Sequence, residues 1–178
     1  MHTDHQQLLV QKARDGDHDA WAAIYIGIYP RLRAYAAART DPGAVEDLVN
    51  ETMARAVAGI HRFTWEPTGF DAWIFGIMRN VYLEHIRKTQ RRRRDAAPEM
   101  VYDGVHPGEA IELAEDHKAV RAAFAKLSPR DREILELRLI SGLSVEQAAK
   151  VLGKRSGAVR TAQSRALANL RQFMEETS

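Results

Sequence analysis

The chain has 178 residues, no cysteine and a formal net charge of +2, and 45% of its residues are hydrophobic. This length suits one domain or two small ones, and the lack of cysteine excludes disulfides and cysteine metal sites. The apolar stretches are too short to span a bilayer and the first residues do not resemble a signal peptide. We therefore expect a cytoplasmic protein with no membrane insertion of its own.

Helical periodicity recurs along the chain, and no segment shows the sustained alternation of a β-strand. The sequence thus predicts an all-α fold, with helices at 5–15, 18–38, 43–60, 69–93, 112–126, 130–141, 144–152 and 156–174. Pro30 should kink or split the second of these helices, because proline removes a backbone hydrogen bond.

Residues 94–111 separate two helical regions. They contain two prolines, two glycines and four acidic side chains and show no amphipathic period, which predicts a flexible acidic linker. We therefore expect an N-terminal domain of residues 1–93 and a C-terminal domain of residues 112–178. Basic residues outnumber acidic ones on both sides of residues 95–127 but not within them. This charge pattern indicates two domains that face nucleic acid and a connector of a different kind.

The helix expected at 43–60 has apolar residues at helical spacing on one side and polar ones on the other. Asp47, Asn50 and Glu51 fall on the polar side. An amphipathic core helix explains this pattern. A helix that also binds a protein partner through its acidic side is the alternative.

The helix expected at 69–93 begins with aromatic and apolar residues and ends with basic ones. Just before it, the segment HRFTWEPTGF carries Phe63 and Trp65 in a loop. In the simplest interpretation the aromatics lie in the core and the cations complement the helix dipole. In the alternative, the cations follow a phosphate backbone while aromatics stack on unpaired bases, which suits melted DNA better than an intact duplex.

The stretch SVEQAAKVLGKRSGAVRTAQSRALANLR, residues 144–171, predicts two helices joined by a tight turn. Ser144 and Gln147 have the spacing of a capping box, and Gly153 suits a left-handed helix end. Ser156 is expected to be the N-cap of the second helix. The pattern matches a helix-turn-helix, whose second helix enters the major groove of DNA. An ordinary helical hairpin with a solvated cationic face is the alternative.

No catalytic or metal-binding arrangement is evident. The seven histidines are scattered without the His-Glu-x-x-His spacing of zinc enzymes, and glycine-rich phosphate loops and nucleophile elbows are missing. We therefore expect a protein that is not an enzyme and that needs no cofactor.

Three segments in this order resemble bacterial RNA polymerase sigma factors of the extracytoplasmic-function (ECF) group. They are AVEDLVNETMARAV, FDAWIFGIMRNVYLEHIRKTQRRR and LSPRDREILELRLISGLSVEQAAKVLGKRSGAVRTAQSRALANLR. The resemblance covers residues 18–94 and about 112–172. It implies a promoter-directing transcription initiation factor that aids promoter melting.

The resemblance also implies roles for individual residues. The residues that would contact the clamp helices of the largest polymerase subunit are Asp47, Leu48, Asn50 and Glu51. Those that would bind the −10 element are Phe63, Trp65, Arg79, Asn80, Arg87, Lys88 and Arg91. Those that would bind the −35 element are Arg155, Ser156, Arg160, Thr161, Gln163, Ser164 and Arg165. The flap of the second polymerase subunit and an anti-sigma factor are further implied partners.

The recognition helix departs from many relatives at Ala162, and from others at Leu167 and Ala168, where they carry basic residues. We therefore expect a −35 contact that is weaker or that relies on Gln163. Two other functions fit parts of the sequence. A helix-turn-helix regulator that acts without polymerase would leave the N-terminal domain unexplained. A sigma-like decoy for an anti-sigma factor would be expected to have lost the basic residues of both DNA faces.

Overall fold

The computed structural model describes residues 2–95 and 115–176, and within those ranges it contains helices and no strand. The first range holds α1 (His2–Arg14), α2 (His18–Ala37), α3 (Pro42–Gly59), the short 3₁₀-helix η1 (Ile60–Arg62) and α4 (Gly69–Asp95). The second range holds α5 (Glu115–Lys126), α6 (Pro129–Leu135), the π-helical turn η2 (Glu136–Ile140), α7 (Val145–Leu152) and α8 (Ser156–Glu175). The predicted all-α fold is confirmed.

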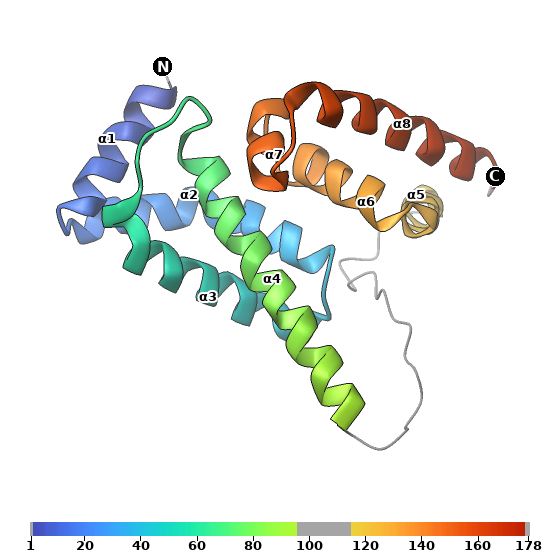
Figure 1. The fold of residues 1–178 in the computed structure, drawn as a ribbon, viewed down its shortest axis with the longest axis horizontal. Coiled ribbons are helices and arrows are strands. Elements are labelled where there is room, and N and C mark those ends of the chain that lie inside the picture. Colours follow the sequence, from blue (N-terminus) through green and yellow to red (C-terminus); the bar gives the residue numbers. More distant parts are fainter. Residues whose placement is uncertain (1, 96–114, 177–178) are drawn as a thin grey trace.

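Helices α1 to α4 form an N-terminal unit in which α2 packs between α1 and α3, and α4 packs along α3 (Figure 1). Aromatic side chains fill its centre: Tyr35, Phe70 and Phe75 are each at most 1% exposed. Burial of such large rings supplies much of the stability of a unit this small. None of the helices in the described ranges is long and apolar enough to cross a membrane.

Helix α2 runs through Pro30 as one helix, so of the predicted kink or split the split does not occur. Pro30 lies on the exposed face of α2. Packing against α1 and α3 on its other sides holds the helix together across the hydrogen bond that proline removes.

Helices α5 to α8 form the C-terminal unit, and its helix-turn-helix is built largely as predicted. Ser144 and Gln147 form a capping box with both hydrogen bonds present, at 3.1 and 2.8 Å. Gly153 ends α7 with a φ of 62°, in the left-handed region that favours glycine. The predicted N-cap is wrong by one residue: Arg155 occupies it, and Ser156 is already the first helical residue.

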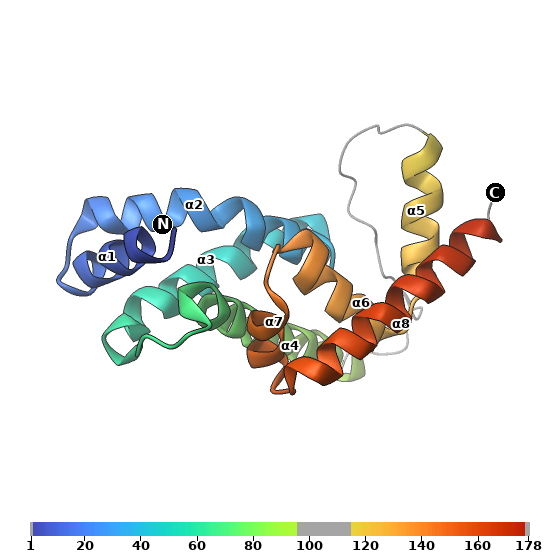
Figure 2. The same ribbon diagram turned by 90° about the horizontal axis from the view of Figure 1, so that it is seen from above.

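The two units pack against each other, with α7 against α4 and η2 against the end of α2 (Figures 1 and 2). One cluster of buried apolar side chains spans both units, and Ile134, Leu137 and Leu143 are among the residues that the C-terminal unit contributes to it. A second cluster, of Leu127, Leu135 and Ala166, lies within the C-terminal unit. Of the predicted linker at 94–111, residues 94 and 95 belong to α4, and the rest lies outside the described residues.

Candidate nucleic-acid interface

The acidic face of α3 presents Asp47, Asn50 and Glu51 to solvent. Leu48, predicted to share this face, is only 3% exposed and lies in the core. The structure therefore brings together three of the four residues predicted to bind a protein partner. In the described ranges no hydrogen bond or ion pair involves the side chain of Asp47, which leaves its charge available.

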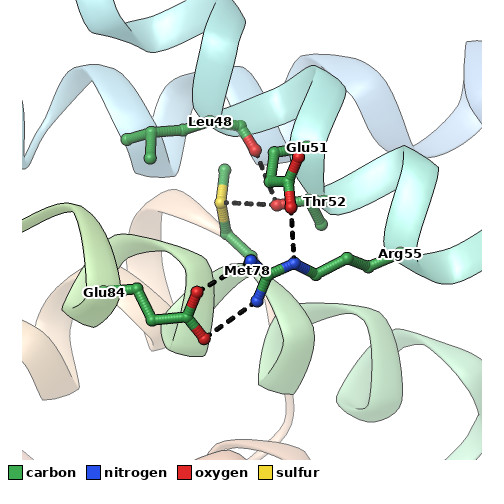
Figure 3. A network of polar contacts seen from close by, with 6 residues as sticks. All are labelled: Leu48, Glu51, Thr52, Arg55, Met78 and Glu84. Carbon is green, nitrogen blue, oxygen red and sulfur yellow. Dashed lines mark hydrogen bonds and ion pairs between the residues drawn. The ribbon is translucent and has the colours of Figure 1, made fainter.

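Glu51 belongs to a polar network that joins α3 to α4 (Figure 3). The Arg55 guanidinium lies 2.7 Å from Glu51 and donates two hydrogen bonds to Glu84 of α4, at 2.9 and 2.7 Å. These hydrogen bonds hold the pKa of Glu84 below its usual value. Beneath the network, the Thr52 hydroxyl donates to the Leu48 carbonyl at 2.7 Å and contacts the Met78 sulfur at 3.2 Å. The acidic face of α3 and helix α4 are thus directly linked.

The loop before α4 forms an aromatic cluster rather than an open set of rings. Phe63 is 6% exposed, and its ring centroid lies 5.1 to 5.8 Å from those of Trp65, Phe70 and Trp73. Phe63 therefore lies in the core of this arrangement, and its role at the −10 element stays a prediction. Trp65 is partly exposed, and of the two predicted loop aromatics it alone offers an accessible edge.

A hollow of about 350 Å³ opens between the end of α3 and the middle of α4. Asn80, which is exposed, and Arg87 line it, and the family resemblance assigned both to the −10 element. Arg62 and Trp73 also line it; the sequence assigned no contact to Arg62 and left the aromatics of this helix open between the core and base stacking. The hollow combines an indole, an amide and cations with one acid, Glu84, which Arg55 pairs, and aromatic and cationic groups of this kind stack on and neutralise an unpaired nucleotide.

The remaining cations predicted for the −10 element fall in two groups. Lys88 and Arg91 are exposed on the later turns of α4. Arg79 instead points to the C-terminal unit, where its Nε lies 2.8 Å from a carboxylate oxygen of Glu133. The structure therefore does not present Arg79 on the same open surface as Asn80.

On α8 the predicted −35 residues spread around the first half of the helix. Arg155, Arg160, Thr161 and Ser164 are exposed, and Ser156 is partly buried. Arg160 lies 3.8 Å from Glu146 of α7, a long and exposed ion pair that DNA phosphates could displace.

Arg165 is exposed on α8 but is also tied to α6 of the C-terminal unit. Its guanidinium lies 3.0 Å from Asp131, whose carboxylate also accepts from Asn169 at 3.4 Å. Burial raises the pKa of Asp131, but hydrogen bonds from Arg165 and Ser128 outweigh this effect and lower it. Arg165 therefore supports the packing of α8 on α6 besides any contact with DNA.

Gln163 is held by a residue that sequence reasoning missed. Arg138 of η2 donates from its Nε to the Gln163 side-chain oxygen at 2.9 Å and from Nη1 to the Leu143 carbonyl. Arginine can only donate hydrogen bonds, so Arg138 binds the side-chain oxygen of Gln163. The amide nitrogen of Gln163 therefore remains available to a ligand. Arg138 joins Arg160, Ser164 and Arg171 along a groove of about 370 Å³, and only a three-dimensional view reveals that it faces α8.

No group of three histidine, aspartate or glutamate side chains in the described ranges is placed to hold a metal ion. The chemistry of these surfaces is that of charge pairing and stacking.

Comparisons with known proteins identify the family of the chain. Residues 24–92 match the pattern of Sigma-70 region 2, and residues 117–170 match that of Sigma-70, region 4. The chain is 31% identical to the ECF RNA polymerase sigma factor BldN of Streptomyces coelicolor, over 94% of this chain and 65% of BldN. It is also 31% identical to the ECF sigma factor ShbA of Streptomyces griseus, over 94% of both chains.

Two solved structures share the fold. The sigma factor RpoE of Bartonella quintana, in complex with the anti-sigma factor NepR, matches with a TM-score of 0.69 and 28% identity, over 86% of this chain and 96% of that one. CnrH, in complex with the cytosolic domain of CnrY, matches with a TM-score of 0.67 over 97% of this chain and 99% of that one. At 22% identity, the second match supports the fold alone.

Proposed function

Because the chain belongs to the ECF family of RNA polymerase sigma factors, we propose that it binds core RNA polymerase and directs it to promoters through −10 and −35 contacts. It would also help to melt the promoter, acting in the cytoplasm and catalysing no reaction itself. The observation that carries this proposal is the hollow lined by Asn80, Trp73 and Arg87, beside an acidic face on α3.

Melting follows from capture of an unpaired base. Taking a base out of the stack costs a few kcal/mol, and stacking on an aromatic ring contributes about 1–3 kcal/mol per base. Trp73 and Asn80 of the hollow, with Arg87 against the backbone, would offset that cost. Groove contacts from α8 would hold the −35 element as duplex.

An anti-sigma factor is the second proposed partner. The structure of Bartonella RpoE contains one, and the exposed acidic and basic faces of this chain suit a protein that covers both. A decoy that only sequesters such a factor fits less well, because Arg87, Lys88, Arg91 and Arg155 all remain exposed. A regulator that acts without polymerase leaves the exposed acids of α3 without a role.

Co-purification with sigma-free core polymerase tests the proposal. We expect the wild-type chain to bind core, and Asp47→Arg to lose most of that binding because it places a cation on the acidic face. Asp15→Arg makes the same charge change at an exposed turn away from α3 and should bind normally. Failure of the wild-type chain to bind core would sink the proposal in favour of the decoy or the independent regulator.

A further inference from the structure

Three arginines of the N-terminal unit reach across to the C-terminal unit. Arg31 donates from Nε to the Ser141 carbonyl at 2.8 Å. Arg39 lies 2.7 Å from Glu136 and 3.4 Å from Glu133. Arg79 lies 2.8 Å from the same Glu133 oxygen. One carboxylate of the C-terminal unit thus bridges two guanidiniums of the N-terminal unit.

This packed arrangement cannot span a promoter. The −10 and −35 elements lie about 25 base pairs apart, which is roughly 85 Å of duplex at about 3.4 Å per base pair. A compact protein of this length has a radius of gyration of about 16 Å, so it is roughly 40 Å across. Since α7 lies against α4, the two units must separate before α4 and α8 can occupy both elements.

If the two units separate, Glu133 and Glu136 move away with the C-terminal unit, while Arg39 keeps its position. Its guanidinium lies over the rings of Tyr35 and Tyr82, at 5.0 and 4.6 Å from their centroids, and it donates to the Tyr35 hydroxyl. Both tyrosines belong to the N-terminal unit. Arg31 differs, because it also pairs with Asp71 of its own unit and so stays neutralised.

Arg39, held by the two tyrosines, and Arg79 would therefore face solvent with no acid between them. Guanidiniums favour carboxylate and phosphate oxygens for the same reason, namely charge-assisted paired hydrogen bonds. In the open chain, a DNA phosphate, which carries a similar charge, can take the place that the Glu133 carboxylate has between the two arginines in the closed chain. Arg79 is next in sequence to Asn80, which lines the hollow, so a DNA strand leaving the hollow can cross α4 to reach this pair.

We propose that Arg39 and Arg79 form a binding site for the DNA backbone that Glu133 and Glu136 cover in the closed chain. The site extends the −10 surface proposed above and rests on that function. The two acids act as internal substitutes for phosphate. Arg39, which no sequence pattern indicated, becomes a DNA-contacting residue once the two units separate.

The test compares substitutions on the two sides of the same ion pairs. The probe is a fluorescent 20-nucleotide oligothymidine, bound by the full-length chain between about 50 and 200 mM KCl. Glu133→Gln, which removes the charge that bridges both arginines, should bind it several-fold more tightly than the wild type. Adding Arg39→Gln to that variant should reverse the gain and reduce the slope of log affinity against log salt by about 0.7, the value for one phosphate contact on single strands.

Arg33→Gln is the matched control, because Arg33 is an exposed arginine of α2 that pairs with Glu46 away from the interface. It should leave the gain of Glu133→Gln intact. Arg39→Lys should restore part of the binding if charge is what matters, and thermal unfolding of every variant reports whether the fold survives.

Two results would overturn the proposal. If Arg39→Gln alone raises binding as Glu133→Gln does, Arg39 only holds the units together. If Glu133→Gln leaves binding unchanged, Glu133 covers no site. Core-polymerase binding by each variant is measured separately, so a failure of the sigma function is distinguishable from a failure of this site.

Discussion

Glu136 is a carboxylate with no exposed surface, placed where the two units meet. Burial raises its pKa to about 7, against the opposing charges of Arg39 and Arg132, while the nearby Glu133 adds to the rise. A raised pKa in the closed chain means that the closed chain binds the proton more tightly than an open chain in which Glu136 is hydrated. Protonation therefore favours closure, and this contribution is lost as the pH rises through about 7.

We expect the equilibrium between closed and open chains to shift toward the open form by about tenfold between pH 6 and pH 8, as linkage requires for this rise in pKa. Energy transfer between dyes at Ala22→Cys and Ala168→Cys, which are exposed positions on different units, would report it. The chain has no cysteine of its own to interfere. In Glu136→Gln the pH dependence should vanish, and an unchanged dependence there would assign it to another group.

At the scale of elements, local signals in the sequence were sufficient to locate the helices. Periodicity and caps such as Ser144 with Gln147 act within one or two turns, so they can be identified without the fold. The π-helical turn η2 was missed and was taken as the end of a regular helix. Its extra residue per turn carries Glu136 into the interface and Arg138 toward α8, and only tertiary packing selects that geometry.

The roles of individual site residues were harder to predict, because a sequence pattern does not show whether a given side chain points to the core or to solvent. Leu48 and Phe63 lie in stretches with the right composition for their predicted roles, yet packing places both in the core. The partners of Arg39 and Arg79 are acids far along the chain. No local pattern encodes contacts at that separation.

The turn between α7 and α8 gives a prediction with an internal control. Gly153→Ala should lower the free energy of unfolding by about 1 kcal/mol, because a side chain disfavours the positive φ of this residue. Gly157→Ala, inside α8 with open space around it, should be neutral or stabilising by up to about 1 kcal/mol. Urea unfolding followed by circular dichroism measures both, and equal effects would contradict the left-handed turn.

At the scale of the whole molecule, the contacts between the two units define a closed chain. Beyond the arginine pairs, Lys150 of α7 lies 2.8 Å from Glu66, and Gln147 donates to the Thr68 carbonyl at 3.1 Å. The helix-turn-helix therefore rests on the loop that precedes α4. Opening exposes that loop together with the basic pair.

Binding to core polymerase should lower energy transfer between the dyes at Ala22→Cys and Ala168→Cys, because the two units must lie farther apart to reach both promoter elements. A pair at Ala22→Cys and Ala58→Cys, both exposed on the N-terminal unit, should not change. Unaltered transfer in the first pair would mean that the closed arrangement persists on polymerase.

The ion pairs that Glu133 makes with Arg39 and Arg79 also matter while the chain is being synthesised. Ribosomes build the chain from its N-terminus at about 5–20 residues per second, and domains generally fold as they emerge. The arginines are therefore made, and their helices can fold, seconds before the acids that neutralise them exist. During every round of synthesis the unfinished protein carries an uncovered basic surface amid the RNA of the translation machinery, and completing the last helices is the step that covers it.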